Sequence, residues 1–189
     1  MSELKLDQVT HTYTLDGRRI DGLTSTIAEA GLIRSSDLWY LKKGTAVHRA
    51  TELWDKGTLD ESTVHPDIIG YLESWKCFRK DQNYTPLYIE KSLFDSIYLY
   101  AGTVDRLPLL DLKSGSKEAF HKWQLAGYWN LCKINGFEKL YQNPQNIYLD
   151  SDGGPPMVLN YTQAQMREAL KEFFIILSFV RLKRSVGIK

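Results

Sequence analysis

A carboxylate and an amine are separated by a single residue in the segment Asp111-Leu112-Lys113. Side chains alternate along a strand, so both groups would point to the same face and share one pocket. Such a pair suits metal-dependent hydrolysis, in which the acid holds the ion. The amine would then orient or deprotonate the attacking water, or stabilise the transition state, and the sequence does not choose among these roles. The string is common, and an exposed ion pair is the alternative interpretation.

A second acid, Asp105, ends the segment 101–105, which is typical of a neighbouring strand joined to the first by a tight turn at Pro108. Antiparallel pairing of these strands would bring Asp105 beside Asp111. Two carboxylates held that close repel each other unless a cation lies between them, and a few oxygen donors suit Mg²⁺ or Mn²⁺. Gly102 indicates either a close neighbour or a bulge in this strand.

His48 is the candidate ligand from a helix. It follows Gly44 by four residues, so the two share one helical face. A lone histidine is usually a hydrogen-bonded side chain, but beside a carboxylate pair its imidazole is a competent metal ligand. Glu90, on the strand before Asp105, is a further possible oxygen donor. Glu52, one turn beyond His48, is expected to be a solvated carboxylate.

Gln124 and Tyr128 lie one turn apart on the helix that is predicted to follow Lys113. An amide and a phenol on one face could hydrogen bond a phosphate or orient the lysine. An ordinary amphipathic surface is the alternative.

The N-terminal elements predicted to carry this chemistry begin with a β-hairpin. Its strands are 9–15 and 18–21, and Asp16-Gly17 forms the turn because this pair accepts positive φ. Thr24, Ser25 or Thr26 would cap a short helix ending near residue 31. Ser35-Ser36-Asp37 would cap a longer helix that ends at about residue 56, before Gly57.

The remainder of the chain predicts a sheet between further helices. Apolar residues at helical spacing indicate a helix from Pro66 to about residue 80, and runs of β-branched, aromatic and aliphatic residues indicate strands. Thr162 would cap the final helix, which reaches about residue 183. The expected strands are 87–93, 96–107, 109–113, 146–150 and 157–160, the last two forming a hairpin, and a helix is expected at 117–135.

Composition narrows the classes of protein. At 189 residues we expect one domain, and the net charge of +1 excludes a global basic field. Two cysteines without paired spacing exclude a zinc knuckle and an iron–sulfur cluster. No signal peptide or membrane-length apolar run is present, which predicts a cytoplasmic protein. Local basic patches, or equally solvated surfaces, are Arg34, Lys42, Lys43 and Arg49, and Arg181, Lys183, Arg184 and Lys189.

The motifs G-x-x-x-H, E, G-x-x-D, D-x-K and Q-x-x-x-Y occur in this order over roughly residues 44–128. Together they resemble the RecB-like and phage-exonuclease branch of the PD-(D/E)XK nuclease superfamily. His11-Thr12-Tyr13, followed by Asp16-Gly17 and a Thr-Ser-Thr segment, is also similar to the start of many prophage members.

The resemblance implies an α/β fold with a central mixed β-sheet flanked by helices, and hydrolysis of DNA phosphodiester bonds with Mg²⁺ or Mn²⁺. The four cysteines of the iron–sulfur members are missing, so no such cluster is expected. By position, the implied metal ligands are His48, Asp105, Asp111, the carbonyl of Leu112 and, less constantly, Glu90, while Lys113 matches the catalytic lysine and Gln124 and Tyr128 match the fourth motif.

The implied role is that of a phage-type exonuclease in DNA recombination or repair, with DNA and a phage single-strand-annealing recombinase as the expected partners. Three alternatives stay open. The chain could be a structure-selective or nicking endonuclease, a catalytically silent DNA-binding recombination module, or a hydrolase of RNA or nucleotides. The motifs leave the oligomeric state unspecified.

Overall fold

The computed structural model describes residues 3–7, 10, 12–33 and 38–188. Several sequence-based predictions lie outside these residues. They are the strand start at Val9, the His11 of the N-terminal motif, the basic residues Arg34 and Lys189, and the Ser35-Ser36-Asp37 helix cap.

A mixed β-sheet forms the centre of the molecule, as the sequence predicts. Its strands follow the order β1-β2-β3-β5-β6-β7-β8, and β4 pairs with β5 outside this path. Two pairs are parallel, β3 with β5 and β6 with β7, and the other pairs are antiparallel. The strands are β1 (Leu4–Asp7), β2 (Thr12–Leu15), β3 (Arg18–Gly22), β4 (Tyr88–Asp95), β5 (Tyr100–Leu107), β6 (Leu110–Lys113), β7 (Gln145–Tyr148) and β8 (Met157–Asn160).

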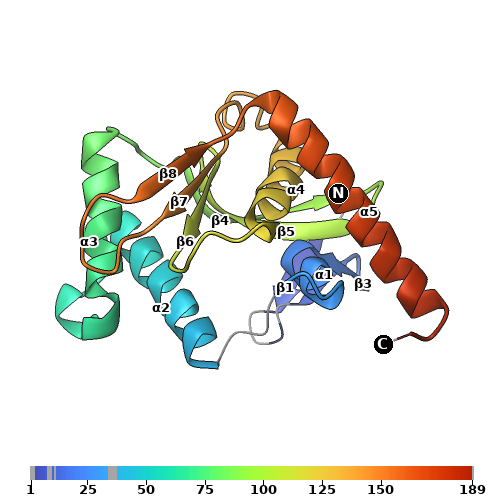
Figure 1. Cartoon of the computed structure of the whole chain (residues 1–189), viewed down its shortest axis with the longest axis horizontal. Helices are drawn as coiled ribbons and strands as arrows, with labels where there is room; N and C mark the ends of the chain where they lie inside the picture. Colours follow the sequence, from blue (N-terminus) through green and yellow to red (C-terminus); the bar gives the residue numbers. More distant parts are fainter. Residues whose placement is uncertain (1–2, 8–9, 11, 34–37, 189) are drawn as a thin grey trace.

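Helices flank this sheet (Figure 1). They bury two separate apolar clusters against it. One cluster joins β4 and β5 to helices α1, α4 and α5, and the other joins β6 and β7 to helices α2 and α3. The predicted fold class is therefore confirmed. The helices are α1 (Leu23–Glu29), α2 (Leu38–Asp55), α3 (Pro66–Asp81), α4 (Phe120–Ile134) and α5 (Gln163–Ser185), with a 3₁₀ turn, η1, at Glu61–Thr63.

The predicted N-terminal hairpin is present as β2 and β3. Asp16 and Gly17 have φ values of 49° and 78°, as a tight two-residue turn requires. The sequence prediction missed the additional strand β1, and it was wrong about the cap of α1. That helix starts at Leu23 with Gly22 as a cap that makes no side-chain hydrogen bond. Thr24, Ser25 and Thr26 therefore lie inside the helix.

Three other predictions have clear structural outcomes. The strand predicted at 96–107 starts only at Tyr100, because Asp95 Oδ1 accepts hydrogen bonds from the amides of Ile97 and Tyr98, both at 2.8 Å, and closes a turn. Thr162 caps α5 in a full capping box, as predicted. The basic C-terminal patch is largely structural, since Arg181 and Arg184 pair with Asp21 of β3.

Two strands, β3 and β6, pair with different parts of the same edge of β5. The stretch of β5 between them borders the candidate site. β3 pairs with β5 at Tyr100 and Ala101, whereas β6 pairs with it at Arg106. Neither of these fully described strands pairs with β5 at residues 102–105. Because β3 runs parallel to β5 and β6 runs antiparallel to it, the C-terminal ends of β3 and β6 converge on this gap.

Candidate metal centre and active site

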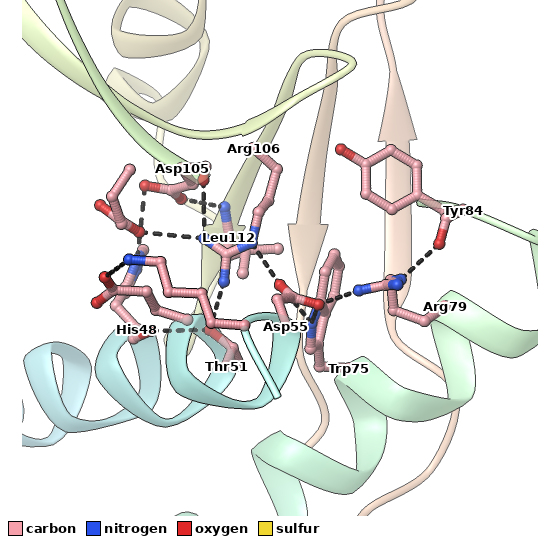
Figure 2. A network of polar contacts seen from close by, with 12 residues as sticks. His48, Thr51, Asp55, Trp75, Arg79, Tyr84, Asp105, Arg106 and Leu112 are labelled. Atoms are coloured by element: carbon pink, nitrogen blue, oxygen red, sulfur yellow. Dashed lines mark hydrogen bonds and ion pairs between the residues drawn. The ribbon is translucent and has the colours of Figure 1, made fainter. Parts of the chain in front are cut away.

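An imidazole and two carboxylates meet beside β5. One ligand atom from each of His48, Glu90 and Asp105 lies within 4.8 Å of the others, and we call these three residues the acid cluster. His48 Nδ1 is 3.5 Å from Asp105 Oδ1. Figure 2 shows His48 reaching up from α2 towards Asp105 on the sheet. Asp105 is buried, while the side chains of His48 and Glu90 are 32 % and 28 % exposed, so the cluster opens to solvent on their side.

A local distortion of β4 directs Glu90 into the cluster. Ile89 pairs with Arg106 and Lys91 with Val104, so the same register continues on both sides of Glu90. Glu90 itself has φ of +50° and makes no ladder pair with Asp105, the residue opposite it in that register. A non-glycine residue at positive φ is strained, and such strain is concentrated at functional sites.

Asp111 and Lys113 form the second part of the site, on β6. Lys113 Nζ lies 2.7 Å from Asp111 Oδ2 and donates a hydrogen bond of 2.7 Å to Gln124 Oε1. The predicted common face of Asp111 and Lys113 is therefore present, and the Asp111 side chain is buried. The amide of Leu112 donates a 2.6 Å hydrogen bond to Asp105 Oδ2, which joins this strand to the acid cluster.

Burial and mutual repulsion change how the acids titrate. Burial, reinforced by the charge of Asp105, raises the pKa of Glu90 to about 8. Burial also raises the pKa of Asp111 to about 7, where the charge of Asp105 adds to the effect and Lys113 opposes it. Burial lowers the pKa of His48, although Asp105 and a hydrogen bond with the Leu112 backbone oppose this shift. A neutral imidazole can act as a metal ligand.

These residues fit a divalent cation. The carboxylates of Glu90, Asp105 and Asp111 lie on three neighbouring strands, and Asp111 Oδ2 accepts no hydrogen bond with good geometry from the described residues. A hard cation would offset the cost of burying these charges and the repulsion from Asp105, which together raise both pKa values. Carboxylate oxygens with one imidazole and a backbone carbonyl match the ligand preferences of Mg²⁺ and Mn²⁺.

A second charged cluster, which is buried, lies beside the acid cluster at the C-terminal end of α2. The sequence patterns did not predict it. Asp55 accepts a 2.6 Å hydrogen bond from Arg106 Nε, pairs with Arg79, and accepts from the indole of Trp75 at 3.2 Å. We call Asp55, Trp75, Arg79 and Arg106 the arginine network (Figure 2). Arg106 also donates to Glu90 Oε1 at 3.1 Å, so the network contacts the acid cluster.

Helix α4 approaches the sheet closely behind the site. A Cβ on Gly102 would lie 2.7 Å from the ring of Tyr128, and Gly102 keeps regular pairing with Leu93. Of the two interpretations of this glycine, a close neighbour is therefore correct and a bulge is wrong. Gln124 Nε2 donates to the Tyr128 hydroxyl at 3.3 Å, so the predicted amide–phenol pair also exists.

The structure thus places the eight sequence-predicted site residues in two linked groups around β5 and β6. His48, Glu90 and Asp105 form one group, and Asp111, Lys113, Gln124 and Tyr128 form the other, with Leu112 between them. Glu52, expected to be solvated, instead pairs with Arg49 and Lys56. Arg106 was missed because its partner Asp55 is distant in sequence, although a charged residue within an apolar strand is itself a signal of a buried ion pair.

Comparison with known proteins gives a fold relationship. No protein-family model and no curated protein matches the chain. A crystal structure from Eubacterium rectale, described as a "putative exonuclease", superposes with a TM-score of 0.63 at 12% sequence identity, covering 89% of this chain and 82% of that one. In the described residues, every helix is too short or too polar to cross a bilayer. At this low identity the likeness shows that the two chains share a fold.

Proposed function

We propose that this chain is a metal-dependent deoxyribonuclease that hydrolyses phosphodiester bonds, in the manner of the phage-type exonucleases that its motifs resemble. The observation that carries the proposal is the meeting of His48, Glu90 and Asp105 next to the Asp111–Lys113 pair. The shared fold with a structure described as a "putative exonuclease" supports it.

The acid cluster would hold Mg²⁺ or Mn²⁺, with Asp111 and the Leu112 carbonyl as further oxygen donors. When bound, the ion would supply an acidified water and would neutralise charge on the scissile phosphate. The neutral His48 would bind without competing for a proton, since burial lowers its pKa.

Lys113 would act on the reacting groups from the opposite side. The ammonium donates one N–H to Gln124 Oε1 and forms an ion pair with Asp111 Oδ2. Because an ammonium has three N–H donors, it could also donate to the attacking water or to a phosphate oxygen. Held at 2.7 Å by both partners, the ammonium needs little reorganisation as charge develops in the transition state.

The test is incubation of the protein with end-labelled linear DNA and with closed circular DNA, in Mg²⁺, Mn²⁺ or EDTA. We expect cleavage with either metal, none in EDTA, and none with Asp111→Ala. Glu168→Gln on α5, which removes an exposed carboxylate, is the matched control and should keep wild-type activity. Cleavage limited to linear DNA supports an exonuclease, and cleavage of circles supports an endonuclease. Absence of cleavage under every condition, or full activity of Asp111→Ala, contradicts the proposal.

A further inference from the structure

We propose that Thr24 is a positioning residue that fixes the catalytic lysine through Gln124. This inference rests on the proposed nuclease function and assigns a role to the N-terminal part of the chain. Thr24 Oγ1 accepts a 2.9 Å hydrogen bond from Gln124 Nε2, while Gln124 Oε1 accepts from Lys113 Nζ at 2.7 Å. The three side chains therefore form a continuous chain from α1 through α4 to β6.

The chemistry of the amide explains why Thr24 matters. A glutamine side chain has an acceptor at one end and two donors at the other, so it attracts the Lys113 ammonium in only one of its two orientations. Thr24 Oγ1 and the Tyr128 hydroxyl receive the Nε2 end, at 2.9 and 3.3 Å. With its NH₂ group held there, the amide presents Oε1 to Lys113.

The fold supplies this contact through a close approach of two helices. A Cβ on Gly127 of α4 would lie 2.2 Å from Leu23 Cδ1, so the glycine lets the first turn of α1 pack directly on α4. Thr24, the next residue along α1, then reaches Gln124, one turn before Gly127. Thr24 lies just beyond β3 and Lys113 ends β6, the two strands whose ends converge on the gap beside β5.

Thr24 is exposed and does not cap α1. Its hydroxyl contacts Gln124, whereas that of the next residue, Ser25, makes a contact within α1. Ser25, also exposed, donates to the carbonyl of Gly22 at 3.0 Å, a local contact within α1. Ser25→Ala is therefore a matched control that removes a hydroxyl from the same helical turn.

The experiment measures steady-state cleavage of linear double-stranded DNA with Mn²⁺ for wild type, Thr24→Val, Thr24→Ser and Ser25→Ala. For Thr24→Val, which keeps the shape and removes the hydroxyl, we expect kcat to fall about three- to tenfold with KM unchanged, as for loss of one hydrogen bond. Thr24→Ser should restore kcat, and Ser25→Ala should match wild type. Equal kcat for Thr24→Val and wild type overturns the inference.

A double-mutant cycle then tests whether Thr24 acts through Gln124. In a Gln124→Ala background, Thr24→Val should change kcat by less than about twofold, because the intermediary is already gone. An undiminished effect there, or a rise in KM alone, would mean that Thr24 contacts DNA directly and would overturn the inference. Wild-type protein without cleavage would instead contradict the proposed function, so the two failures are distinct.

Discussion

The partly exposed acid cluster and the buried arginine network lie side by side where α2 meets the sheet, and they differ in how their charge is balanced. In the arginine network, Asp55 is enclosed by two guanidinium groups and an indole N–H, all from the protein itself. In the acid cluster, Glu90 and Asp105 face each other across a distorted strand, and the pKa of Glu90 rises to about 8. The first cluster is balanced by groups of the protein itself, whereas the proposed function assigns a bound cation to the second.

The largest expected effect is on activity, and it comes from the acid cluster. Asp105→Asn should reduce DNA cleavage by more than about a hundredfold, since loss of outer-shell partners of metal ligands alone costs about 10- to 100-fold. Folding stability should hold or rise, because the change removes a repelling buried charge. Cleavage assays together with urea unfolding measure both effects. If the variant cleaved DNA at a rate within about tenfold of wild type, Asp105 would not be a metal ligand.

Changes in the arginine network should lower the free energy of unfolding, in contrast to the effect on cleavage that is expected for the acid cluster. Arg106→Met leaves the buried Asp55 without one of its two guanidinium partners, and removing one partner of a buried pair typically costs about 3–5 kcal/mol. Urea unfolding measures the loss. Lys171→Met, which breaks an exposed pair with Glu168, is the control and should cost less than about 1 kcal/mol. Similar small losses for both variants would mean that the network is not a stabilising unit.

The next prediction is that Mn²⁺ raises the melting temperature through the acid cluster. At about 100 times its dissociation constant, Mn²⁺ stabilises a protein by about 2.7 kcal/mol, or roughly 5–10 °C in melting temperature for a chain of this size. We expect this shift for wild type and its loss for Asp105→Asn. Thermal melts with Mn²⁺ and with EDTA provide the measurement. An equal shift in both proteins would place the bound ion elsewhere.

The last expected effect concerns pH in the absence of metal. The folded pKa values of Glu90 and Asp111, about 8 and about 7, lie above the ordinary values of 4.5 and 3.8 for these side chains. The folded state therefore binds more protons, and stability should fall as pH rises from about 4 to 8, by at most about 1.4 kcal/mol per pH unit for each group.

Urea unfolding in EDTA between pH 5 and pH 8.5 tests this sign. Glu90→Gln should make the unfolding free energy less dependent on pH at the upper end of this range, because Asp111 is then the only one of the two acids that still titrates. Stability that rises steadily with pH in the wild type, and equally in Glu90→Gln, would show that these acids are not the groups that govern it.

The parts of the site that the sequence predicts follow from local geometry. The spacing of Asp111 and Lys113 on a strand, and of Gln124 and Tyr128 on a helix, determines a shared face wherever the element lies. The short turn at Pro108 likewise keeps Asp105 close to β6, where it accepts a hydrogen bond from the Leu112 amide. These juxtapositions need no knowledge of the remaining chain.

The parts that it does not predict depend on long-range packing. Asp55 and Arg106 are far apart in sequence, and nothing local indicates that they pair. Thr24 matches a helix-cap pattern, yet Gly22 takes that position and frees the Thr24 side chain for Gln124. Glu90 has a positive φ at the position opposite Asp105, and the strand pattern alone does not reveal this.

The most direct test of the metal centre is anomalous diffraction from crystals soaked in Mn²⁺. An anomalous peak within coordinating distance of His48, Glu90 and Asp105, absent from crystals of Asp105→Asn, is the predicted result. A peak bound to other residues, or no peak there in crystals of the active wild-type protein, would contradict the assignment of this cluster as the metal site.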